Sequence, residues 1–251
     1  MSVYWFQQTE ADVPLENDWL SATEAVCLNG LRFAKRRADW RLGRWTAKRA
    51  LSIHLDLPAH VQVFRKIEVR PAPSGAPEAF VDNHPAGVTM SLSHRNGTAI
   101  CALAASGVEM GCDLEVIEPR SDAFVADYFS VEEQAQVARE FAADRPRLLA
   151  LLWSAKESAL KALCAGLRFD TRSVTVRRSP EPFDLNGWSL LQVHYTGGHH
   201  EGIHPDESKI FHGWYQLADN MVRTVVSATP LDPPLFLRVR DRVFDGSYRC
   251  A

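Results

Sequence analysis

The feature that most constrains the fold is a helical pattern between about residues 145 and 165. Its leucines recur at helical spacing and predict an apolar stripe that packs on a core, and Gly166 is placed to end the helix. Glu157 and Lys161 are four residues apart, so they lie on one face of this helix. Alone, such a pair is usually a solvated salt bridge, but an acidic segment upstream favours a functional role.

The acidic segment is 111–115, Gly-Cys-Asp-Leu-Glu, which apolar residues flank on both sides. Alternate residues of a strand share a face, so Asp113 and Glu115 are expected to project together. Two carboxylates on one side of a buried strand repel each other and lose solvation unless a cation lies between them. Together with Glu157 they predict a three-carboxylate oxygen site, which suits Mg²⁺ better than zinc.

Composition excludes several classes of protein. The chain has 251 residues, enough for one large domain or two halves of ordinary size, and its net charge of −3 gives no argument for nucleic acid or a membrane surface. No stretch has the apolar length of a spanning helix, and the first ten residues lack the order of a signal peptide. The 5 cysteines are scattered without a CxxC, so we expect reduced thiols in a cytoplasmic protein that binds neither nucleic acid nor membrane.

The rest of the chain reads as a mixture of helices and mostly short strands. Helices are predicted over 15–28, 36–57, 130–143 and 145–165, and strands over 3–7, 61–69, 88–93, 98–104, 108–117, 171–177, 188–195, 210–217 and 221–228. Asn96-Gly97 and Asp219-Asn220 predict hairpin turns. A glycine-rich segment with His199, His200 and His204 lacks the ligand spacing of a zinc site and is predicted to be an exposed loop.

Taken together, the motifs resemble those of the Sfp-type phosphopantetheinyl transferases. That family carries Gly-x-Asp-x-Glu and, tens of residues later, Trp-x-x-Lys-Glu-[Ala/Ser]-x-x-Lys. The matching residues here are Gly111, Asp113 and Glu115, then Trp153, Lys156, Glu157, Ser158 and Lys161. Residues 90–94 resemble the family's Ser-x-Ser-His, whereas 75–77 reads Gly-Ala-Pro where the family often has Gly-Lys-Pro, so one lysine contact to phosphate is missing.

The resemblance implies an α+β fold built from two similar halves about a pseudo-twofold axis, with the ligand site in the seam. Residues 1–106 would form the coenzyme A-binding half, and residues 107–251 the half with the Mg²⁺-binding acids and the signature helix. The implied activity, of the holo-acyl-carrier-protein synthase type, transfers 4′-phosphopantetheine from coenzyme A to a serine of an apo acyl or peptidyl carrier protein and releases 3′,5′-ADP. Another Mg²⁺-dependent phosphodiesterase and a non-catalytic coenzyme A-binding module remain as alternatives, and the chain's length favours a monomer.

The resemblance also assigns roles on the acidic side of the site. Asp113, Glu115 and Glu157 would hold Mg²⁺, or Mn²⁺ in its place. Glu157, directly or through a metal-bound water, is the candidate general base for the serine hydroxyl. Lys161 would contact the same phosphate, and Lys156 would either hold the carboxylate of Glu157 or contact the incoming substrate.

Further candidates come from the first half of the chain. Ser93 and His94 would donate hydrogen bonds to the pyrophosphate. A basic stripe on the first long helix supplies Arg37, Arg44 and Lys48 as candidates for the ribose 3′-phosphate, although a charged stripe is equally typical of a solvated helix face. An aromatic group at residues 124–129 is either a docking patch for the carrier protein or part of the core.

Overall fold

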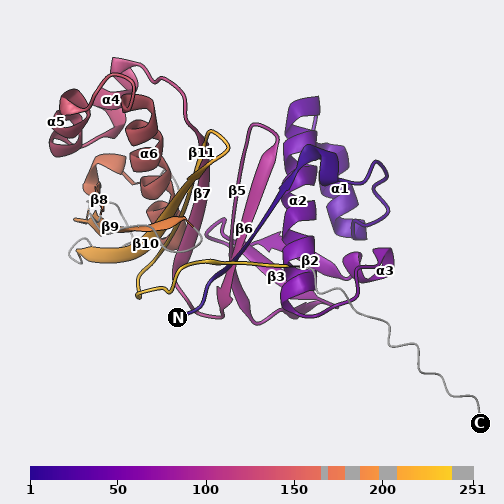
Figure 1. The fold of residues 1–251 in the computed structure, drawn as a ribbon. Coiled ribbons are helices and arrows are strands. Elements are labelled where there is room, and N and C mark those ends of the chain that lie inside the picture. Colours follow the sequence, from indigo (N-terminus) through magenta and orange to yellow (C-terminus); the bar gives the residue numbers. More distant parts are fainter. Residues whose placement is uncertain (165–168, 179–186, 198–207, 239–251) are drawn as a thin grey trace, which may run out of the picture.

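The computed structural model describes residues 1–164, 169–178, 187–197 and 208–238, and Figure 1 shows helices gathered on two sides of a central set of strands. The helices are α1 (Ala22–Gly30), α2 (Ala34–His54), α3 (Val61–Phe64), α4 (Asp122–Tyr128), α5 (Val131–Arg139) and α6 (Arg145–Ala162), with short 3₁₀ turns η1 (Glu10–Asp12) and η3 (Thr171–Ser173). The strands are β1 (Tyr4–Thr9), β2 (Ile67–Pro71), β3 (Pro77–Val81), β4 (His84–Pro85), β5 (Val88–Arg95), β6 (Thr98–Ala105), β7 (Met110–Val116), β8 (Val174–Arg178), β9 (Trp188–Tyr195), β10 (Lys209–Ala218), β11 (Met221–Ser227) and β12 (Leu235–Phe236).

The strands form separate, mainly antiparallel sheets. One sheet has the order β12-β1-β6-β5, a second has the order β7-β11-β10-β9-β8, and a small sheet has the order β2-β3-β4. Within the described residues, the pairing of β1 with β12 is parallel and the other pairings are antiparallel. Helices packed on antiparallel sheets define an α+β protein, as the sequence predicted.

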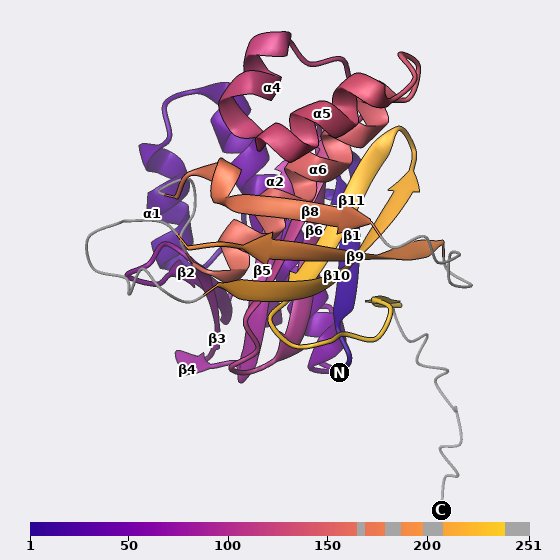
Figure 2. The ribbon, with the colours of Figure 1, turned by 90° about the vertical axis from the view of Figure 1, so that its left-hand side faces the viewer.

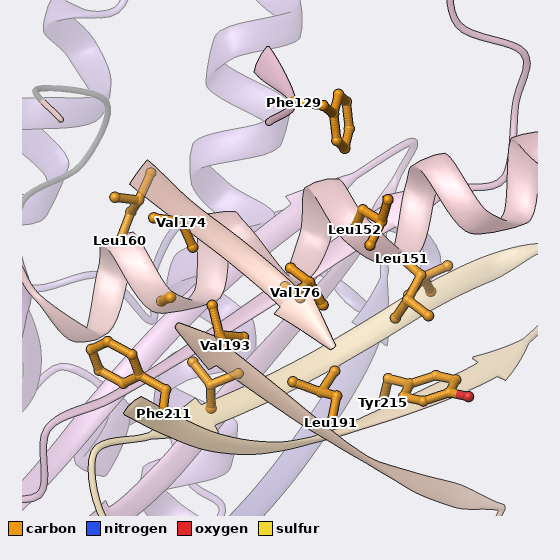
Figure 3. Packing of buried hydrophobic residues seen from close by; sticks show 14 of the residues in the cluster. Phe129, Leu151, Leu152, Leu160, Val174, Val176, Leu191, Val193, Phe211 and Tyr215 are labelled. Carbon is orange, nitrogen blue, oxygen red and sulfur yellow. The ribbon is translucent and has the colours of Figure 1, made fainter. Parts of the chain in front are cut away.

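Each of the two larger sheets is covered by one long helix. Helix α2 packs on β1, β5 and β6, whereas α6 packs on β7, β11 and the strands beyond them. Figures 1 and 2 show these helices on different sides of the molecule, with α4 and α5 near α6. Figure 3 shows the core beneath α6, where leucines of the helix meet valines and aromatic rings of β8, β9 and β10. The predicted apolar stripe is therefore the face that α6 buries.

Strand β7 lies where the two sheets meet. It pairs with β11 in its own sheet and lies alongside β5, the edge strand of the other. The backbone N–H of Cys112 donates to Ser91 Oγ at 2.9 Å, so a side chain of β5 accepts a hydrogen bond from the backbone of β7. Helix α6 is tied to β11 through Thr224 Oγ1, which lies 2.9 Å from Ser154 Oγ and 2.7 Å from Ser158 Oγ.

Several local predictions need correction. Helix α1 begins at Ala22, not at 15, because Ser21 and Glu24 form the capping box that starts it. The predicted strand 61–69 is split into α3 and β2, and α4 occupies a segment in which no helix was predicted. Helix α6 ends at Ala162, and Cys164 adopts a positive φ of 53°. Gly166, like His199, His200 and His204, lies outside the described residues.

The two predicted hairpins are present, with Asn96, Gly97, Asp219 and Asn220 all at positive φ. The chain after residue 229 returns to the first sheet, where Leu235 pairs with Tyr4. The division at residue 106 into two domains stays a prediction. Among the described residues, none of the helices has the length and apolar character needed to cross a bilayer.

Gly111→Ala is expected to destabilise the protein because a Cβ at this position would lie 1.9 Å from the carbonyl oxygen of Ser158. Backbone cannot yield as a flexible side chain does, so β7 and α6 must separate, at a cost of about 1–3 kcal/mol or more. Urea unfolding measures the loss. Gly30→Ala is the control, since its Cβ would meet nothing within 4 Å. Equal stability of the Gly111 variant and wild type would contradict the close contact.

Candidate active site

Asp113 is the centre of the acidic cluster. It lies on β7, is 4% exposed, and its Oδ1 accepts hydrogen bonds from Ser93 Oγ at 2.8 Å and from Lys161 Nζ at 2.7 Å. Among the described residues, its second oxygen, Oδ2, is buried without a hydrogen-bond partner. Lys161 therefore balances the charge of this carboxylate, and Oδ2 remains a buried acceptor that is not satisfied.

Glu115 projects from the same strand two residues later and is balanced by arginines. Its Oε2 lies 3.0 Å from Arg120 Nη2 and 3.6 Å from Arg95 Nε. Burial and the charge of Asp113 raise the pKa of Glu115, while the two arginines and a hydrogen bond from Trp153 oppose that rise. The predicted shared face of Asp113 and Glu115 is consistent with this mutual repulsion.

Glu157 of α6 completes the predicted set of acids. Burial raises its pKa to about 7, with further contributions from the charges of Asp113 and Glu115, and Lys161 opposes them. Among the described residues, Glu157 has no ion pair or hydrogen bond. The structure thus brings the three carboxylates into electrostatic contact, with a charge deficit that a cation would relieve.

The acids do not form a closed metal site as they stand. Within the described part of the chain, no group of three or more His, Cys, Asp or Glu side chains is arranged to hold a metal ion. Lys161 and Ser93 occupy Asp113 Oδ1, and Arg120 occupies Glu115 Oε2. The donor chemistry nevertheless fits Mg²⁺, because the set is all oxygen and Asp113 Oδ2 is buried without a partner.

A cavity of about 1150 Å³ adjoins these acids, between α2, the strands β3–β5 and the end of α6. Arg44, His94 and Lys161 line it. Because Lys161 also contacts Asp113, this lysine joins the cavity to the acidic cluster. Ala76, where the resembling family often carries lysine, lines the same cavity. The cavity therefore has a cationic group, Lys161, where it meets the acids.

His94 and Ser93 follow one another on β5 but face different neighbours. Ser93 donates to Asp113, so the structure places it with the acids, while His94 lines the cavity. Desolvation lowers the pKa of His94, and the charges of Lys161 and Lys35 add to the shift against those of Asp39 and Asp113. A neutral imidazole is therefore the dominant form at neutral pH.

The residues of the predicted basic stripe lie in different environments. Arg44 lines the cavity and stacks over Trp40 at 5.0 Å, and its Nε has no hydrogen-bond partner in the described part of the chain. Burial lowers the pKa of Arg44, with Glu24 opposing, and arginine remains charged. Arg37 instead donates to the carbonyl oxygens of Leu28 and Leu31, at the end of α1, and is not among the residues that line the cavity.

Two predicted contacts to substrate require correction. Lys48 is fully buried, with Nζ 2.5 Å from Glu24 Oε2, and so cannot reach a phosphate in the cavity. Lys156 is fully buried as well, with Nζ 2.7 Å from Glu133 Oε2, and contacts neither Glu157 nor an incoming substrate. Buried charges need a partner, and the partners of these lysines come from other helices, which local spacing could not reveal.

Glu24 and Glu133 were not predicted as part of the site. Each closes the capping box of a short helix, and the Ser-x-x-Glu pattern of such a box occurs at Ser21 and at Ser130. A second signal lies in the long helices, since 45–48 reads Trp-Thr-Ala-Lys and 153–156 reads Trp-Ser-Ala-Lys. Arg95 and Arg120, the partners of Glu115, carried no local signal.

The aromatic group at 124–129 is mostly an internal contact of the second half. Phe129 is fully buried, and Phe124 and Tyr128 pack against Trp153 with ring centroids 5.2 and 5.1 Å apart. Tyr128 is 38% exposed. These contacts favour the core interpretation over a docking patch.

Acids beside a cavity lined by arginine, lysine and histidine are typical of a protein that binds a phosphate-bearing ligand with a divalent cation. Residues 109–200 match the model of the 4'-phosphopantetheinyl transferase superfamily, ACPS. The chain is 33% identical over 129 residues to the 4'-phosphopantetheinyl transferase AcpT of Salmonella typhimurium, and 36% identical over 133 residues to that of Salmonella typhi. Each alignment covers 50% of this chain and 58% of the relative, so the chain spans little more than half the length of these curated relatives.

The part of the chain that matches this superfamily model, residues 109–200, contains both motifs on which the resemblance rests. A solved structure, Helicobacter pylori holo-acyl-carrier-protein synthase in complex with coenzyme A, is also similar, at 18% identity. It covers 41% of this chain and 99% of its own, with a TM-score of 0.33. A likeness of that size does not define a shared fold or ligand.

Lys48→Met is expected to destabilise the protein by about 3–5 kcal/mol because it leaves the buried carboxylate of Glu24 without its cation. Urea unfolding measures the change. Lys35→Met is the matched control: its side chain is 84% exposed and pairs with Asp39 on the surface, so about 0.5 kcal/mol or less should be lost. If the two variants lost the same free energy of unfolding, Lys48 would be solvated and the buried pair with Glu24 would be contradicted.

Proposed function

We propose that the protein transfers the 4′-phosphopantetheine arm of coenzyme A to a serine hydroxyl of an apo acyl or peptidyl carrier protein. The observation that carries the proposal is the position of Lys161, which lines the cavity and donates to Asp113 at 2.7 Å. A phosphate beside this ammonium would lie between a cavity large enough for a nucleotide and the three acids. The match of residues 109–200 to the transferase superfamily supports the same activity.

In the proposed reaction the serine oxygen forms a bond to the β-phosphorus of coenzyme A, and the pyrophosphate P–O bond breaks to release 3′,5′-ADP. Lys161 would stabilise negative charge on the transferred phosphate as a point charge. His94, as a neutral imidazole, would donate a hydrogen bond to the pyrophosphate from the cavity wall. Glu157, which belongs to the same acidic cluster, would accept the serine proton either directly or through a water.

Asp113, Glu115 and Glu157 would hold Mg²⁺, or Mn²⁺ in its place. When bound, the cation would offset charge on the phosphate oxygens during the transfer. Ser93 would orient Asp113 through its hydrogen bond to Oδ1, leaving Oδ2 for the cation. Arg95 and Arg120 would keep Glu115 ionised and directed toward the cluster.

We further propose the Sfp-type architecture of two similar halves about a pseudo-twofold axis, residues 1–106 and 107–251. The support is a recurring order, in which a short capped helix is followed by a long helix and then by antiparallel strands. The seam would then run along β5 and β7, beside the cavity. A cytoplasmic monomer that binds neither nucleic acid nor membrane remains part of the proposal.

Mass spectrometry of a purified apo carrier protein after incubation with the enzyme, coenzyme A and Mg²⁺ tests the activity. A gain of one phosphopantetheine on the carrier serine supports the proposal, and the gain should vanish in excess chelator. Hydrolysis of generic phosphodiesters with an unmodified carrier would instead identify a different Mg²⁺-dependent phosphodiesterase. Coenzyme A binding with no product from any tested carrier class would leave a binding module.

Arg44→Ala is expected to raise the Michaelis constant for coenzyme A more than that for dephospho-coenzyme A. Arg44 is the guanidinium that lines the cavity, and a charge-assisted bond to the 3′-phosphate contributes roughly 1.5–3 kcal/mol. Steady-state kinetics with both donors measures the difference. Arg36→Ala, an exposed residue of the same helix, is the control. An equal rise of the Michaelis constants for both donors would show that Arg44 does not contact the 3′-phosphate.

Glu157→Gln should reduce transfer far more than coenzyme A binding, because the amide keeps the shape but cannot accept the proton. Losing general base catalysis alone costs roughly 10²–10⁴-fold. Asp113→Asn should chiefly raise the Mg²⁺ requirement, so high Mg²⁺ recovers part of its rate. Holo-carrier formation and coenzyme A binding are followed separately in Mg²⁺ titrations, with the exposed Glu132→Gln as control. Full recovery of the Glu157 variant by Mg²⁺ would reduce that residue to a replaceable ligand.

A further inference from the structure

The two long helices each carry a buried lysine that is held in the same way. In α6, Lys156 Nζ lies 2.7 Å from Glu133 Oε2 and also donates to the carbonyl oxygens of Thr171 and Val174. Its ammonium lies 5.3 Å from the centre of the Phe129 ring. Three acceptors, from α5, from the turn η3 and from the start of β8, therefore surround one cation, which is fully buried.

In α2, Lys48 repeats these contacts. Its Nζ lies 2.5 Å from Glu24 Oε2, donates to the carbonyl oxygens of Trp19 at 3.1 Å and Phe64 at 2.8 Å, and lies 5.5 Å from the Trp19 ring. This lysine is fully buried as well. The same arrangement of one cation, one carboxylate, two carbonyls and one aromatic ring thus occurs once under each long helix.

The two glutamates also make corresponding hydrogen bonds with the backbone. Glu133 accepts from the backbone N–H of Ser130 at 3.0 Å and from that of Val176 at 3.1 Å. Glu24 accepts from the backbone N–H of Ser21 at 3.2 Å and from that of Val69 at 3.4 Å. Each glutamate therefore joins the start of a short helix, a strand of the neighbouring sheet and the lysine of the long helix. We name these groups the α6 clamp (Lys156 and Glu133) and the α2 clamp (Lys48 and Glu24).

Stability alone does not account for two such clamps. Removing a pair of charges from water costs several kcal/mol per ion, and apolar residues of similar volume often serve as well or better. What an ion pair with several directed hydrogen bonds supplies is a fixed position for the helix that carries it. Since the ammonium must meet three acceptors at once, the helix can neither rotate about its axis nor slide along it without losing one.

Each clamp lies close to residues of the candidate site on the same helix. Glu157 directly follows Lys156, and α6 also carries Lys161, which contacts Asp113. On α2, the residue one turn before Lys48 is Arg44, whose Nε lies 4.0 Å from Glu24 Oε1 and whose side chain lines the cavity. One clamp therefore adjoins the acids, and the other adjoins the cavity.

We propose that the clamps are positioning devices with separate tasks: the α6 clamp sets Glu157 and Lys161 against Asp113 for the metal and phosphate, and the α2 clamp sets Arg44 against the coenzyme. The tasks rest on the proposed function. The clamps act through the helices, and neither lysine touches a ligand. Replacing a group that orients a ligating residue typically lowers metal affinity by roughly 10–100-fold.

The test compares two double variants that remove both charges of a clamp, Glu133→Gln with Lys156→Met and Glu24→Gln with Lys48→Met. Glutamine keeps an acceptor for the strand N–H, and losing both charges together avoids a lone buried ion. Calorimetry measures Mg²⁺ and coenzyme A affinities, and urea unfolding measures stability. The α6 variant is expected to bind Mg²⁺ roughly 10–100-fold more weakly, with a smaller loss of coenzyme A affinity that arises from the displaced Lys161. The α2 variant is expected to show the reverse pattern.

Single variants keep the test informative if a double variant does not fold. Glu133→Gln and Glu24→Gln alone remove the charge but leave each lysine two backbone carbonyls, and the same crossed pattern is expected in milder form. Equal losses of both affinities in both clamps, in proportion to stability, would overturn the proposal and leave the pairs a purely structural role. Unchanged affinities in destabilised variants would overturn it too. Because both readouts are binding constants, they hold whether or not any carrier protein is modified.

Discussion

The close contact of β7 with α6 at Gly111 is the constraint on which the site depends. With no side chain at Gly111, the helix backbone at Ser158 packs directly on the strand. That distance lets Lys161, the last lysine of α6, reach Asp113 and the carbonyl of Cys112. A wider separation would leave the acids of strand and helix in different solvent environments, and their mutual repulsion would disappear.

The electrostatic balance of the site follows from this packing. Asp113 has one oxygen neutralised by Lys161 and a second oxygen buried without a partner. Glu115 is compensated by Arg95 and Arg120, while burial, and after it the charges of Asp113 and Glu115, raise the pKa of Glu157. The protein thus carries most, but not all, of the positive charge that its acids require. A site in that condition favours a cation over a neutral ligand, and the adjoining cavity favours an anion beside it.

Local patterns predicted the residues of the site better than their roles. The acids, His94 and Lys161 were found because each belongs to a short motif on one strand or helix, whose periodicity states which residues share a face. Lys48 was misassigned for the same reason, since its spacing on α2 placed it on a basic stripe. Whether such a lysine meets water or a buried carboxylate depends on Glu24, which comes from another helix. The strand predicted over 61–69 failed similarly, because the short helix α3 and β2 divide an apolar run that fits either structure.

By itself, the sequence determined the resemblance to the superfamily, the two hairpin turns, the long helices and the two motifs that carry the acids, because each of these depends on residues within one or two turns or strands of each other. Only the tertiary structure decided which charges are solvated, that a single lysine links the acids to a cavity, and that Lys48 and Lys156 are buried beneath matching helices. The physical reason is that desolvation and ion pairing are properties of the surroundings. Those surroundings are assembled from segments that lie far apart along the chain.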